Sequence, residues 1–406
     1  MHILFLSHYF PPEVNAPATR TYEHCKHWVE MGHSVTVISC VPNHPMGRVY
    51  SGFKNRFYHQ EEVAGIKVIR LLTYVTANAG FFKRTLNYLL YMVMTILVAP
   101  WIAKTDVVVS TSPQFFNGLA GYFVAAIKRA PWCLEIRDLW PDSITAVGAT
   151  HNKTIIKLLE GLERFVYRKA DHIVAVTYSF EQHIIRKGAD PSAITVIRNG
   201  VDFDVFKVQK KNQQFAQRLG LANKFVASYV GTHGMAHGLD VILDAAELCR
   251  QDNDLVFLMV GDGAEKQRLL AEKNSRRLDN LIMLDQQDKS KMPDIWSVSD
   301  LSLVLLKKQD VFLTVIPSKI FESMAMKKPI ILGVQGEAQA LIEEAQAGIC
   351  IMPQDAHQLV QAVRQLQTEQ DNYQNCAEAG YRYAKTHFDR SLLATQYEQV
   401  LRALIG

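Results

Sequence analysis

The residues with the clearest chemical potential lie in the stretch 310–337. Lys319 and Glu322 stand three positions apart, so on a helix they would share one face of a turn. Pro317 suits the first position of a helix, because its missing N–H is not needed there, and Ser318 can cap the free backbone donors. A helix N-terminus beside a lysine and a carboxylate can bind a phosphate and a hydroxyl. The alternative at this point is an exposed Lys–Glu pair on an ordinary helix.

The length and the charge distribution of the chain limit the kind of protein to which this stretch can belong. The 406 residues exceed one typical hydrophobic core, so two domains are expected. Residues 1–200 carry 21 Lys+Arg and 14 Asp+Glu, a balance of +7, whereas the remaining residues carry 23 and 26, a balance of −3. A basic first half suggests an anionic surface or ligand there, although ordinary scatter also accounts for such a difference.

Cysteine and histidine usage argues against a disulfide scaffold or a metal hydrolase. The six cysteines are dispersed without a CxxC pair, which predicts reduced core thiols in a cytoplasmic protein. No basic leader precedes an apolar run at the N-terminus, so no signal peptide is predicted. The 14 histidines include no HxxxH pair on a helix with a nearby carboxylate. Asp202 and Asp204 match a DxD pattern, but they lie in a connector, so we expect neither a metal nor another cofactor.

Apolar strands alternate with helices through the first half, which predicts a doubly wound α/β sheet. The loop after the first strand lacks GxGxxG, so a dinucleotide fingerprint is absent. This loop, with Asn15 in it and Arg20 just beyond, sits where open sheets bind ligands. Further on, Arg137 and Asp138 follow a buried strand and point into a cleft, or else form a strand-end salt bridge. The strands are expected at 3–7, 34–39, 66–71, 106–111, 132–137, 172–177 and 194–198.

The segment 85–103 is nearly apolar and almost long enough to cross a bilayer. A sheet strand follows at once, and a spanning helix could not return the chain to the same domain. We therefore expect a helix packed on the sheet, with an exposed apolar face flanked by Lys83 and Arg84 that contacts the membrane. A helix buried in the core and a spanning helix are the alternatives.

The α/β pattern restarts after a connector that begins near Asn199 and Gly200. In this second half the loop 231–238 carries three glycines, which allow close backbone approach to a diphosphate. A small-residue turn is the plainer interpretation of that loop. Gln286 follows the third strand and could contact the edge of a nucleobase through its backbone groups. The strands are expected at 225–230, 255–260, 281–284, 301–305, 329–332 and 349–351, and two helices close the chain at 369–387 and 391–404.

The order of these motifs resembles that of the GT-B glycosyltransferases, and within them it is most similar to glycosyltransferase family 4. The resemblance rests on four features: the opening Ser7-His8-Tyr9-Phe10-Pro11-Pro12-Glu13, the connector Asn199-Gly200-Val201-Asp202, the glycine-bearing loop, and Pro317-Ser318-Lys319 followed by Glu322 and Ala325. More narrowly, the chain looks like the bacterial O-antigen and capsule enzymes that transfer N-acetyl-L-fucosamine.

The resemblance implies two Rossmann-like domains facing a cleft: an acceptor domain at 1–199, to which a C-terminal helix within 387–406 crosses back, and a donor domain at 200–386. It further implies a retaining, metal-independent transfer from a nucleotide-diphosphate sugar, UDP-linked by expectation. The family's second glutamate maps onto Glu322, a ribose ligand, whereas its first falls on Thr314. Its phosphate-binding arginine and lysine fall near Thr232 and His237, so neither usual cation is present.

The expected site residues follow from that mapping. Asp138, Lys319 and Glu322 are the catalytic candidates; Asp138 either deprotonates the acceptor hydroxyl or only binds it, in which case the leaving phosphate takes the proton. Acceptor-binding residues are Asn15, Arg20, Arg137 and Asp138. Donor-binding residues are Arg198, Asn199, Gly200, Thr232, His233, Gly234, Gln286, Thr314, Val315, Ile316, Ser318, Lys319 and Glu322.

The expected partners are a nucleotide-sugar donor, a lipid-linked sugar acceptor and the cytoplasmic face of the inner membrane, with no nucleic acid. Two other functions fit the same fold. One is a nucleotide-sugar 2-epimerase, which needs no acceptor, and the other is a non-catalytic nucleotide-sugar-binding protein, suggested by the missing cations and by Thr314.

Overall fold

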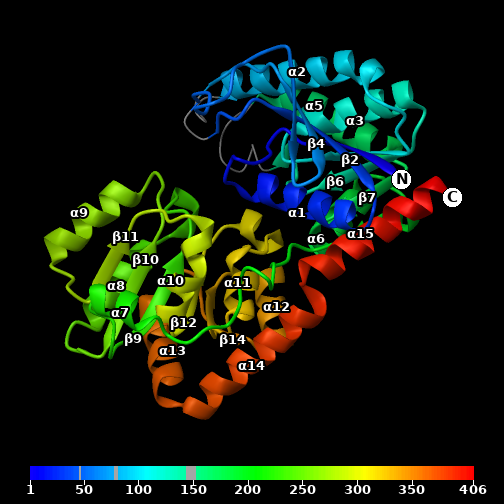
Figure 1. Ribbon diagram of the computed structural model, residues 1–406. Coiled ribbons are helices and arrows are strands. Elements are labelled where there is room, and N and C mark those ends of the chain that lie inside the picture. The colour runs from blue at the N-terminus through cyan, green and yellow to red at the C-terminus, as the bar shows by residue number, and fades with distance from the viewer. Residues whose placement is uncertain (45–46, 77–80, 143–151) are drawn as a thin grey trace. The chain divides into compact units, whose positions relative to one another are not determined.

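The computed structural model describes residues 1–44, 47–76, 81–142 and 152–406. The chain divides into two compact units, which are described one at a time (Figure 1). The N-terminal unit comprises Met1–Arg198 together with Ser391–Gly406, and the C-terminal unit comprises Asn199–Arg390.

The N-terminal unit is built on an eight-stranded sheet with the order β3-β4-β2-β1-β5-β6-β7-β8. All neighbours pair in parallel except β3, which pairs antiparallel with β4 at one edge. Without β3, the chain order of the parallel strands is that of a doubly wound sheet, with its switch point between β1 and β5. The strands are β1 His2–Leu6, β2 Ser34–Cys40, β3 Tyr58–Val63, β4 Ile66–Leu71, β5 Val107–Thr111, β6 Trp132–Ile136, β7 His172–Ala175 and β8 Ile194–Val196.

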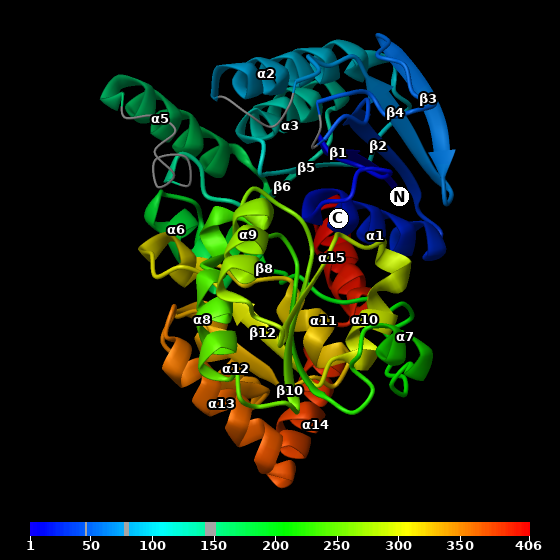
Figure 2. The same ribbon diagram turned by 90° about the vertical axis from the view of Figure 1, so that its left-hand side faces the viewer.

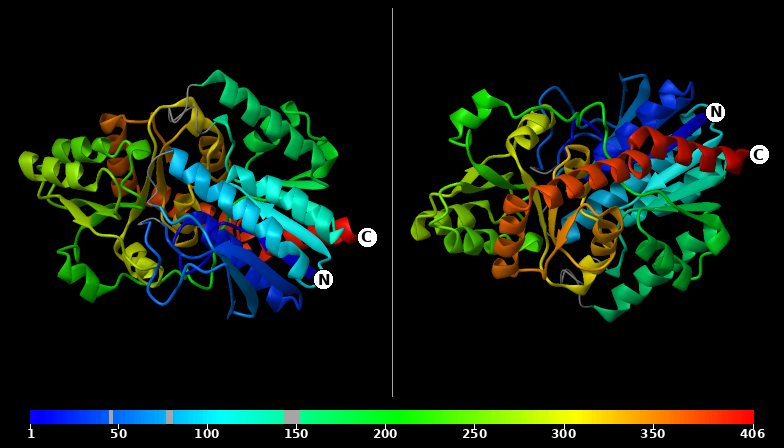
Figure 3. Two further views of the ribbon diagram at one scale, coloured as in Figure 1. Left: turned by 90° about the horizontal axis from the view of Figure 1, so that it is seen from above. Right: turned by 90° about the horizontal axis from the view of Figure 1, so that it is seen from below.

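Alternation along the central strand divides the core of this unit into two layers. Leu4 and Leu6 pack with α2, α3 and α5, and the left view of Figure 3 shows these helices lying along one face. Ile3 and Phe5 point to the opposite face and pack with α1 and α15. Both faces are therefore covered, as a parallel sheet requires. The helices are α1 Ala16–Glu30, α2 Phe81–Val98, α3 Phe115–Lys128, α5 Lys153–Lys169, α6 Tyr178–Arg186 and α15 Arg390–Ile405.

The last helix, α15, belongs to the first unit although it follows the second in sequence. Trp28 Nε1 on α1 donates to the Ala394 carbonyl over 3.0 Å, and the Tyr397 ring meets the Trp28 ring edge-on. Figure 2 shows α15 beside α1. The predicted return of the C-terminal helix to the first domain is confirmed.

The C-terminal unit contains a six-stranded, entirely parallel sheet with the order β11-β10-β9-β12-β13-β14. In chain order this is 3-2-1-4-5-6, the Rossmann arrangement, with the switch point between β9 and β12. The predicted fold class, two Rossmann-like α/β domains, is thus confirmed. The strands are β9 Phe225–Val230, β10 Leu255–Val260, β11 Leu281–Leu284, β12 Leu301–Leu305, β13 Ile330–Gly333 and β14 Gly348–Cys350.

Helices cover both faces of this second sheet. Residues of α10, α11, α12 and α14 form one core layer, and residues of α8, α9 and α13 form the other. The helices are α7 Gln213–Arg218, α8 Asp240–Leu248, α9 Lys266–Arg276, α10 Met292–Val298, α11 Lys319–Ala325, α12 Glu337–Ala345, α13 Ala356–Thr368 and α14 Gln370–His387.

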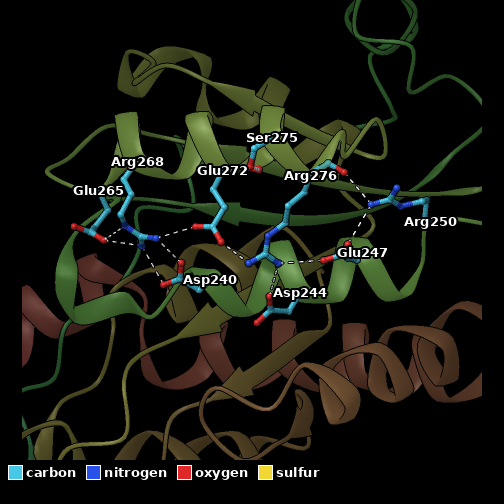
Figure 4. Close-up of polar contacts among 9 residues, drawn as sticks. All are labelled: Asp240, Asp244, Glu247, Arg250, Glu265, Arg268, Glu272, Ser275 and Arg276. Atoms are coloured by element: carbon cyan, nitrogen blue, oxygen red, sulfur yellow. Dashed lines mark hydrogen bonds and ion pairs between the residues drawn. The ribbon is translucent and has the colours of Figure 1, made fainter.

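Two neighbouring helices of this unit, α8 and α9, are joined at the surface by a ladder of ion pairs (Figure 4). Arg268 contacts Asp240 at 2.7 Å and Glu265 at 2.7 Å, and Arg276 contacts Asp244 at 2.6 Å. These groups are largely exposed, so each pair contributes little to stability.

Two local expectations were wrong. The antiparallel strand β3 was not predicted, because its polar, exposed sequence YHQEEV lacks an apolar pattern. The helix predicted from Pro317 begins only at Lys319, and the Ser318 side chain makes no capping bond, because its backbone is already helical (φ −61°, ψ −25°). The resulting helix has seven residues. It therefore offers only a short dipole to a ligand, which leaves side chains as the main source of positive charge.

The main buried ion pair of the N-terminal unit joins Arg20 on α1 to Glu135 on β6, Nε to Oε1, at 2.9 Å. The guanidinium also donates to the carbonyls of Arg198 and Ile197, over 2.8 and 2.9 Å. Burial alone would raise the pKa of Glu135, but the cations of Arg20 and Arg137 hold it below its usual value. Arg20 therefore ties α1 to the sheet.

We predict that Arg20→Met destabilises the N-terminal unit by about 3–5 kcal/mol, because it leaves the buried Glu135 carboxylate without its partner. In scanning calorimetry the corresponding transition should fall by on the order of 10 °C. Arg268→Met, which removes three partly exposed ion pairs of the other unit, is the matched control and should cost only about 1 kcal/mol. Equal shifts for the two variants would contradict this account.

Candidate active site

The switch point of the C-terminal sheet brings two loops together. The loop after β9 contains the glycine turn 231–238, and the loop after β12 leads into α11. The two are joined where Lys307 N–H donates to the Ala236 carbonyl over 2.8 Å. Ligands of open α/β sheets bind at this kind of crevice, beyond the carboxyl ends of the strands.

Two glycines make the close approach of the loops possible. Gly231 has a φ of +144°, and a Cβ there would lie 3.0 Å from Lys319 Nζ. Gly261, after β10, has a φ of +151°, and a Cβ there would lie only 1.9 Å from the Gly231 carbonyl oxygen. Side chains at these positions would displace Lys319 or separate the β9 and β10 loops.

Lys319 is the central group of this crevice. Its Nζ is buried without a hydrogen-bond partner and lies 3.6 Å from the centroid of the Tyr229 ring. Burial lowers the pKa of Lys319 to about 7, and the nearby Glu322 carboxylate opposes this shift. A buried ammonium held only by a ring face and a carboxylate on the same helix is poised to bind an anion.

Two histidines of the glycine turn flank the same ring. His233 is fully buried, and both of its ring nitrogens lack a partner; His237 has an unpartnered Nδ1. Burial, followed by the nearby cations, lowers the pKa of each to about 4. Sequence reasoning placed His233 here only for its backbone and named His237 only as the position of a missing lysine, because burial of their rings is not visible in sequence.

The other predicted donor residues lie on several different segments. Thr232 and Gly234 lie on the glycine turn, and Glu322 is half-buried in the first turn of α11. Thr314 ends a 3-10 turn, where its hydroxyl donates to the Val311 carbonyl over 3.3 Å. Val315, Ile316 and Ser318 connect that turn to α11, and Gln286 is exposed beyond β11.

Arg198, also predicted for the donor, ends the N-terminal unit and lies over the Tyr178 ring at 4.8 Å. Asn199 and Gly200 begin the C-terminal unit. Arg198 and Lys319 thus belong to different units. Asp202, the DxD candidate, accepts from the N–H groups of Asp204 and Val205 and forms a turn.

The N-terminal unit has a pocket of about 270 Å³ at its own switch point, between the loops that follow β1 and β5. Two of the predicted acceptor residues, Asn15 and Asp138, line it. Sequence reasoning missed most of the others, which come from loops and from α2. The lining residues are Tyr9, Asn15, Pro17, His44, Arg84, Tyr88, Pro113, Gln114, Asp138 and Trp140.

The polar groups of this pocket differ in how many of their atoms already have a hydrogen-bond partner. Asn15 caps α1 through Oδ1, which accepts from Ala18 N–H over 2.9 Å, but its buried Nδ2 lacks a partner. Asp138 Oδ2 accepts from Trp140 Nε1 over 3.2 Å. Arg84 contacts the Tyr88 hydroxyl and lies over its ring. The pocket thus offers a carboxylate, an amide donor, a cation and aromatic faces, a combination suited to a phosphorylated sugar.

The two predicted acceptor arginines do not line the pocket. The buried contacts of Arg20 favour a structural role, so we leave it out of the proposed site. Arg137 differs, because its buried Nε and Nη1 atoms lack a partner, and burial lowers its pKa to about 10. The alternative considered for Arg137, a strand-end salt bridge with a carboxylate, is not found among the ion pairs of the described residues. The charge of Glu135 only opposes the lowering of the Arg137 pKa by burial.

Comparisons with known proteins agree with this geometry. Residues 15–200 match the model of a glycosyl transferase 4-like domain, and residues 210–383 match that of glycosyl transferases group 1. The "Putative colanic acid biosynthesis glycosyl transferase WcaI" of Escherichia coli K12 is 25% identical over 376 residues, 90% of this chain and 92% of that protein.

Solved structures show the same fold at lower identity. The Anabaena protein HepE in complex with UDP-glucose aligns with a TM-score of 0.71 and 17% identity, covering 99% of this chain and 100% of that one. Sucrose-phosphate synthase from Thermosynechococcus elongatus aligns with a TM-score of 0.77 and 15% identity, covering 99% of this chain and 98% of that one. Two such Rossmann-like units define the GT-B fold of glycosyltransferases. With the two domain models matched in order along most of its length, this chain belongs to the group 1 glycosyltransferases of family 4.

We predict that Lys319→Met raises the melting temperature of the ligand-free protein. The folded chain holds an ammonium whose pKa is about 7, against 10.5 ordinarily, so its destabilising cost is largest below pH 7 and shrinks as the pH rises towards 10.5. Scanning fluorimetry at pH 6.5 should show a gain of a few °C, roughly 2–4 °C per kcal/mol recovered, and a smaller gain at pH 9.5. The exposed Lys291→Met should change neither value. A lower melting temperature for Lys319→Met at pH 6.5 would refute the unpaired-charge assignment.

Proposed function

We propose that the protein transfers a sugar, with retention of configuration and without a metal ion, from a nucleotide-diphosphate sugar, UDP-linked, to a lipid-linked saccharide of a bacterial surface polysaccharide such as O-antigen or capsule. One observation carries the donor assignment: the buried, unpartnered Lys319 Nζ lies at the β9/β12 switch point. A diphosphate is the ligand whose charge such a group would neutralise.

The proposed donor chemistry is electrostatic. Cleavage of the sugar–phosphate bond places negative charge on the leaving diphosphate, and preorganised donors stabilise that charge. Enzymes lower barriers by roughly 8 kcal/mol or more, which exceeds what one short helix terminus supplies. Lys319 and the N–H groups of Gly234 and Ile316 would act together, while Glu322 binds the ribose hydroxyls. The N–H groups of His233 and Val315, which the sequence also offered, already donate to the Asp262 and Phe312 carbonyls over 2.8 and 3.4 Å.

The proposed acceptor site is the pocket of the N-terminal unit. Asp138 orients or deprotonates the acceptor hydroxyl, Asn15 Nδ2 donates to a sugar oxygen, and Arg84 pairs with a phosphate. Arg137, with two buried and unpartnered nitrogens, remains a proposed contact to an anionic group beside the pocket. The aromatic groups of Tyr9, Tyr88 and Trp140 suit the apolar faces of a sugar ring.

The exposed face of α2 supports a lipid-linked acceptor. Leu86, Val93 and Leu97 lie on one exposed side of this helix, and Trp101 continues it. The neighbouring α3 exposes Phe123 and Ile127, and exposed Lys83 and Lys104 precede and follow the apolar stretch along the chain. Exposed apolar side chains with cations at the ends of the stretch suit the surface of an anionic bilayer. In the part of the chain that is described, no helix has both the length and the hydropathy to span a membrane.

The similar proteins support the polysaccharide assignment. WcaI is named for colanic acid biosynthesis, and HepE was crystallised with UDP-glucose. The finer prediction, that the donor sugar is N-acetyl-L-fucosamine, stays a prediction. So does the placement of the protein on the cytoplasmic face of the inner membrane.

The donor assignment predicts that Lys319→Ala lowers turnover by at least about 100-fold, because it removes a cation that stabilises the leaving diphosphate. The measurement is nucleotide release from UDP-, GDP- and dTDP-sugars with membrane lipid extract. Lys291→Ala, an exposed lysine of the same unit, is the control and should keep wild-type turnover. A folded Lys319→Ala variant with undiminished turnover would remove Lys319 from the site.

The same assay separates the alternative functions. A transferase releases nucleotide only when acceptor lipid is present. A 2-epimerase releases free sugar product without acceptor, and a non-catalytic binding protein releases nothing. Release that is independent of lipid would therefore contradict the proposed transfer.

For the membrane surface we predict that Val93→Glu combined with Leu97→Glu abolishes cosedimentation with liposomes containing phosphatidylglycerol. Each apolar side chain contributes roughly 1.5–3 kcal/mol when buried, so the pair should weaken partitioning by at least about 100-fold. Leu248→Glu, at an exposed apolar position on α8, is the matched control. Unchanged cosedimentation of the double variant would exclude this face.

A further inference from the structure

Several basic side chains around Lys319 have ring or ammonium nitrogens that lack a hydrogen-bond partner. Three side chains, those of His233, His237 and Lys319, present four buried nitrogens without a hydrogen-bond partner. All three surround the Tyr229 ring, whose centroid is 5.9 Å from that of His233, 6.0 Å from that of His237, and 3.6 Å from Lys319 Nζ. Buried polar atoms are normally paired, so a cluster of unpaired nitrogens indicates a ligand rich in acceptor oxygens.

The charged neighbours of His233 are mixed in sign. Lys319 lies on α11, and Lys266 on α9 donates to the Gly261 and Leu284 carbonyls. Among the described residues, Asp262 is the acidic group whose charge acts on this ring; it is itself exposed and accepts from Gly263 N–H. The two lysines outweigh it, so the ligand-free site disfavours an imidazolium.

His237 also presents a ring nitrogen without a partner. Burial lowers the pKa of His237, the backbone of Leu305 opposes that shift, and Nδ1 is buried without a hydrogen-bond partner. A neutral imidazole carries its proton on one nitrogen and a lone pair on the other. The groups that face His237 are Lys319 and His233, and Lys307 borders the same turn.

A lone pair repels an anionic oxygen, whereas a protonated imidazole donates from both nitrogens. We propose that His233 and His237 bind the donor's diphosphate as imidazolium ions, so that donor binding takes up protons from solution. The inference rests on the proposed donor function and deepens it. The bound diphosphate thus induces the charge on the two histidines, beside Lys319, which is already charged at pH 6.

The pH dependence follows from the ligand-free state, in which both histidines have a pKa of about 4. A bound diphosphate raises these values, so the complex holds more protons than the free protein. Affinity should therefore rise as the pH falls through the pKa of the complex, and level off below about pH 4. Lys319, with a pKa of about 7, takes up a proton only above neutrality and is already charged at pH 6.

Calorimetry at pH 6.0 isolates the histidines. UDP-N-acetylglucosamine is the probe, because its diphosphate is esterified at both ends and does not titrate near this pH. Titrations in two buffers of different ionisation enthalpy give the number of protons taken up per bound donor. We expect between one and two at pH 6.0, with a further fraction from Lys319 at pH 8.0.

Variants assign the uptake to residues. His237→Lys supplies a permanent charge, so uptake at pH 6.0 should fall by about one proton while the donor still binds. His233→Asn should lose uptake and weaken binding by about tenfold, the loss of one charge-assisted bond. His357→Asn, at an exposed position on α13, should change neither. Because His233 is buried, its variant is first checked by thermal melting, and His237→Lys alone suffices for the test.

The outcomes separate this inference from the proposed function. Measurable donor binding without proton uptake at pH 6.0, or uptake unchanged in His237→Lys, would overturn the inference and leave the donor function standing. Absence of binding for UDP-, GDP- and dTDP-sugars alike would overturn the donor function and the inference with it.

Discussion

The unpaired ammonium of Lys319 is the constraint on which the C-terminal unit depends. Burying a charge without a partner is costly, and here the ring of Tyr229 and the carboxylate of Glu322 offset only part of that cost. Gly231 leaves the space that the ammonium occupies, and Gly261 lets the next loop approach the Gly231 carbonyl. The pairing of β9 with β10 and β12 fixes these elements and so keeps the ammonium buried without a hydrogen-bond partner.

In the N-terminal unit, by contrast, the buried cation Arg20 is paired. Its buried cation, Arg20, is fully satisfied by Glu135 and by two carbonyls, so it stabilises the fold and offers nothing to a ligand. The pocket proposed for the acceptor is lined instead by Asp138 and Arg84. On this proposal one arginine of the unit, Arg20, stabilises the fold, and another, Arg84, contacts the substrate.

Both units bind, on this proposal, at the point where strand order reverses. The reason is geometric: at a switch point two adjacent loops leave the sheet in opposite directions and open a crevice between them. In one unit that crevice carries basic groups only partly balanced by acids, which suits a diphosphate. In the other it carries a carboxylate among aromatic rings, which suits an acceptor hydroxyl. A common scaffold with different loop chemistry is how this fold supports a two-substrate reaction.

The sequence by itself determined the class of fold, because the alternation of apolar strands and helices is a local property, and β4, β9, β10, β11 and β12 were predicted to the residue. It also determined the order of motifs that places the chain in its family, and it singled out Lys319 as a candidate. Only the tertiary structure decided which polar groups are satisfied. Arg20 and Asp138 were both expected at the acceptor, yet Arg20 is bound to Glu135 and two carbonyls, and Asp138 lines a pocket. The role proposed for His233 and His237 rests on the burial of their rings against Tyr229. That packing depends on contacts between strands that are far apart in the chain.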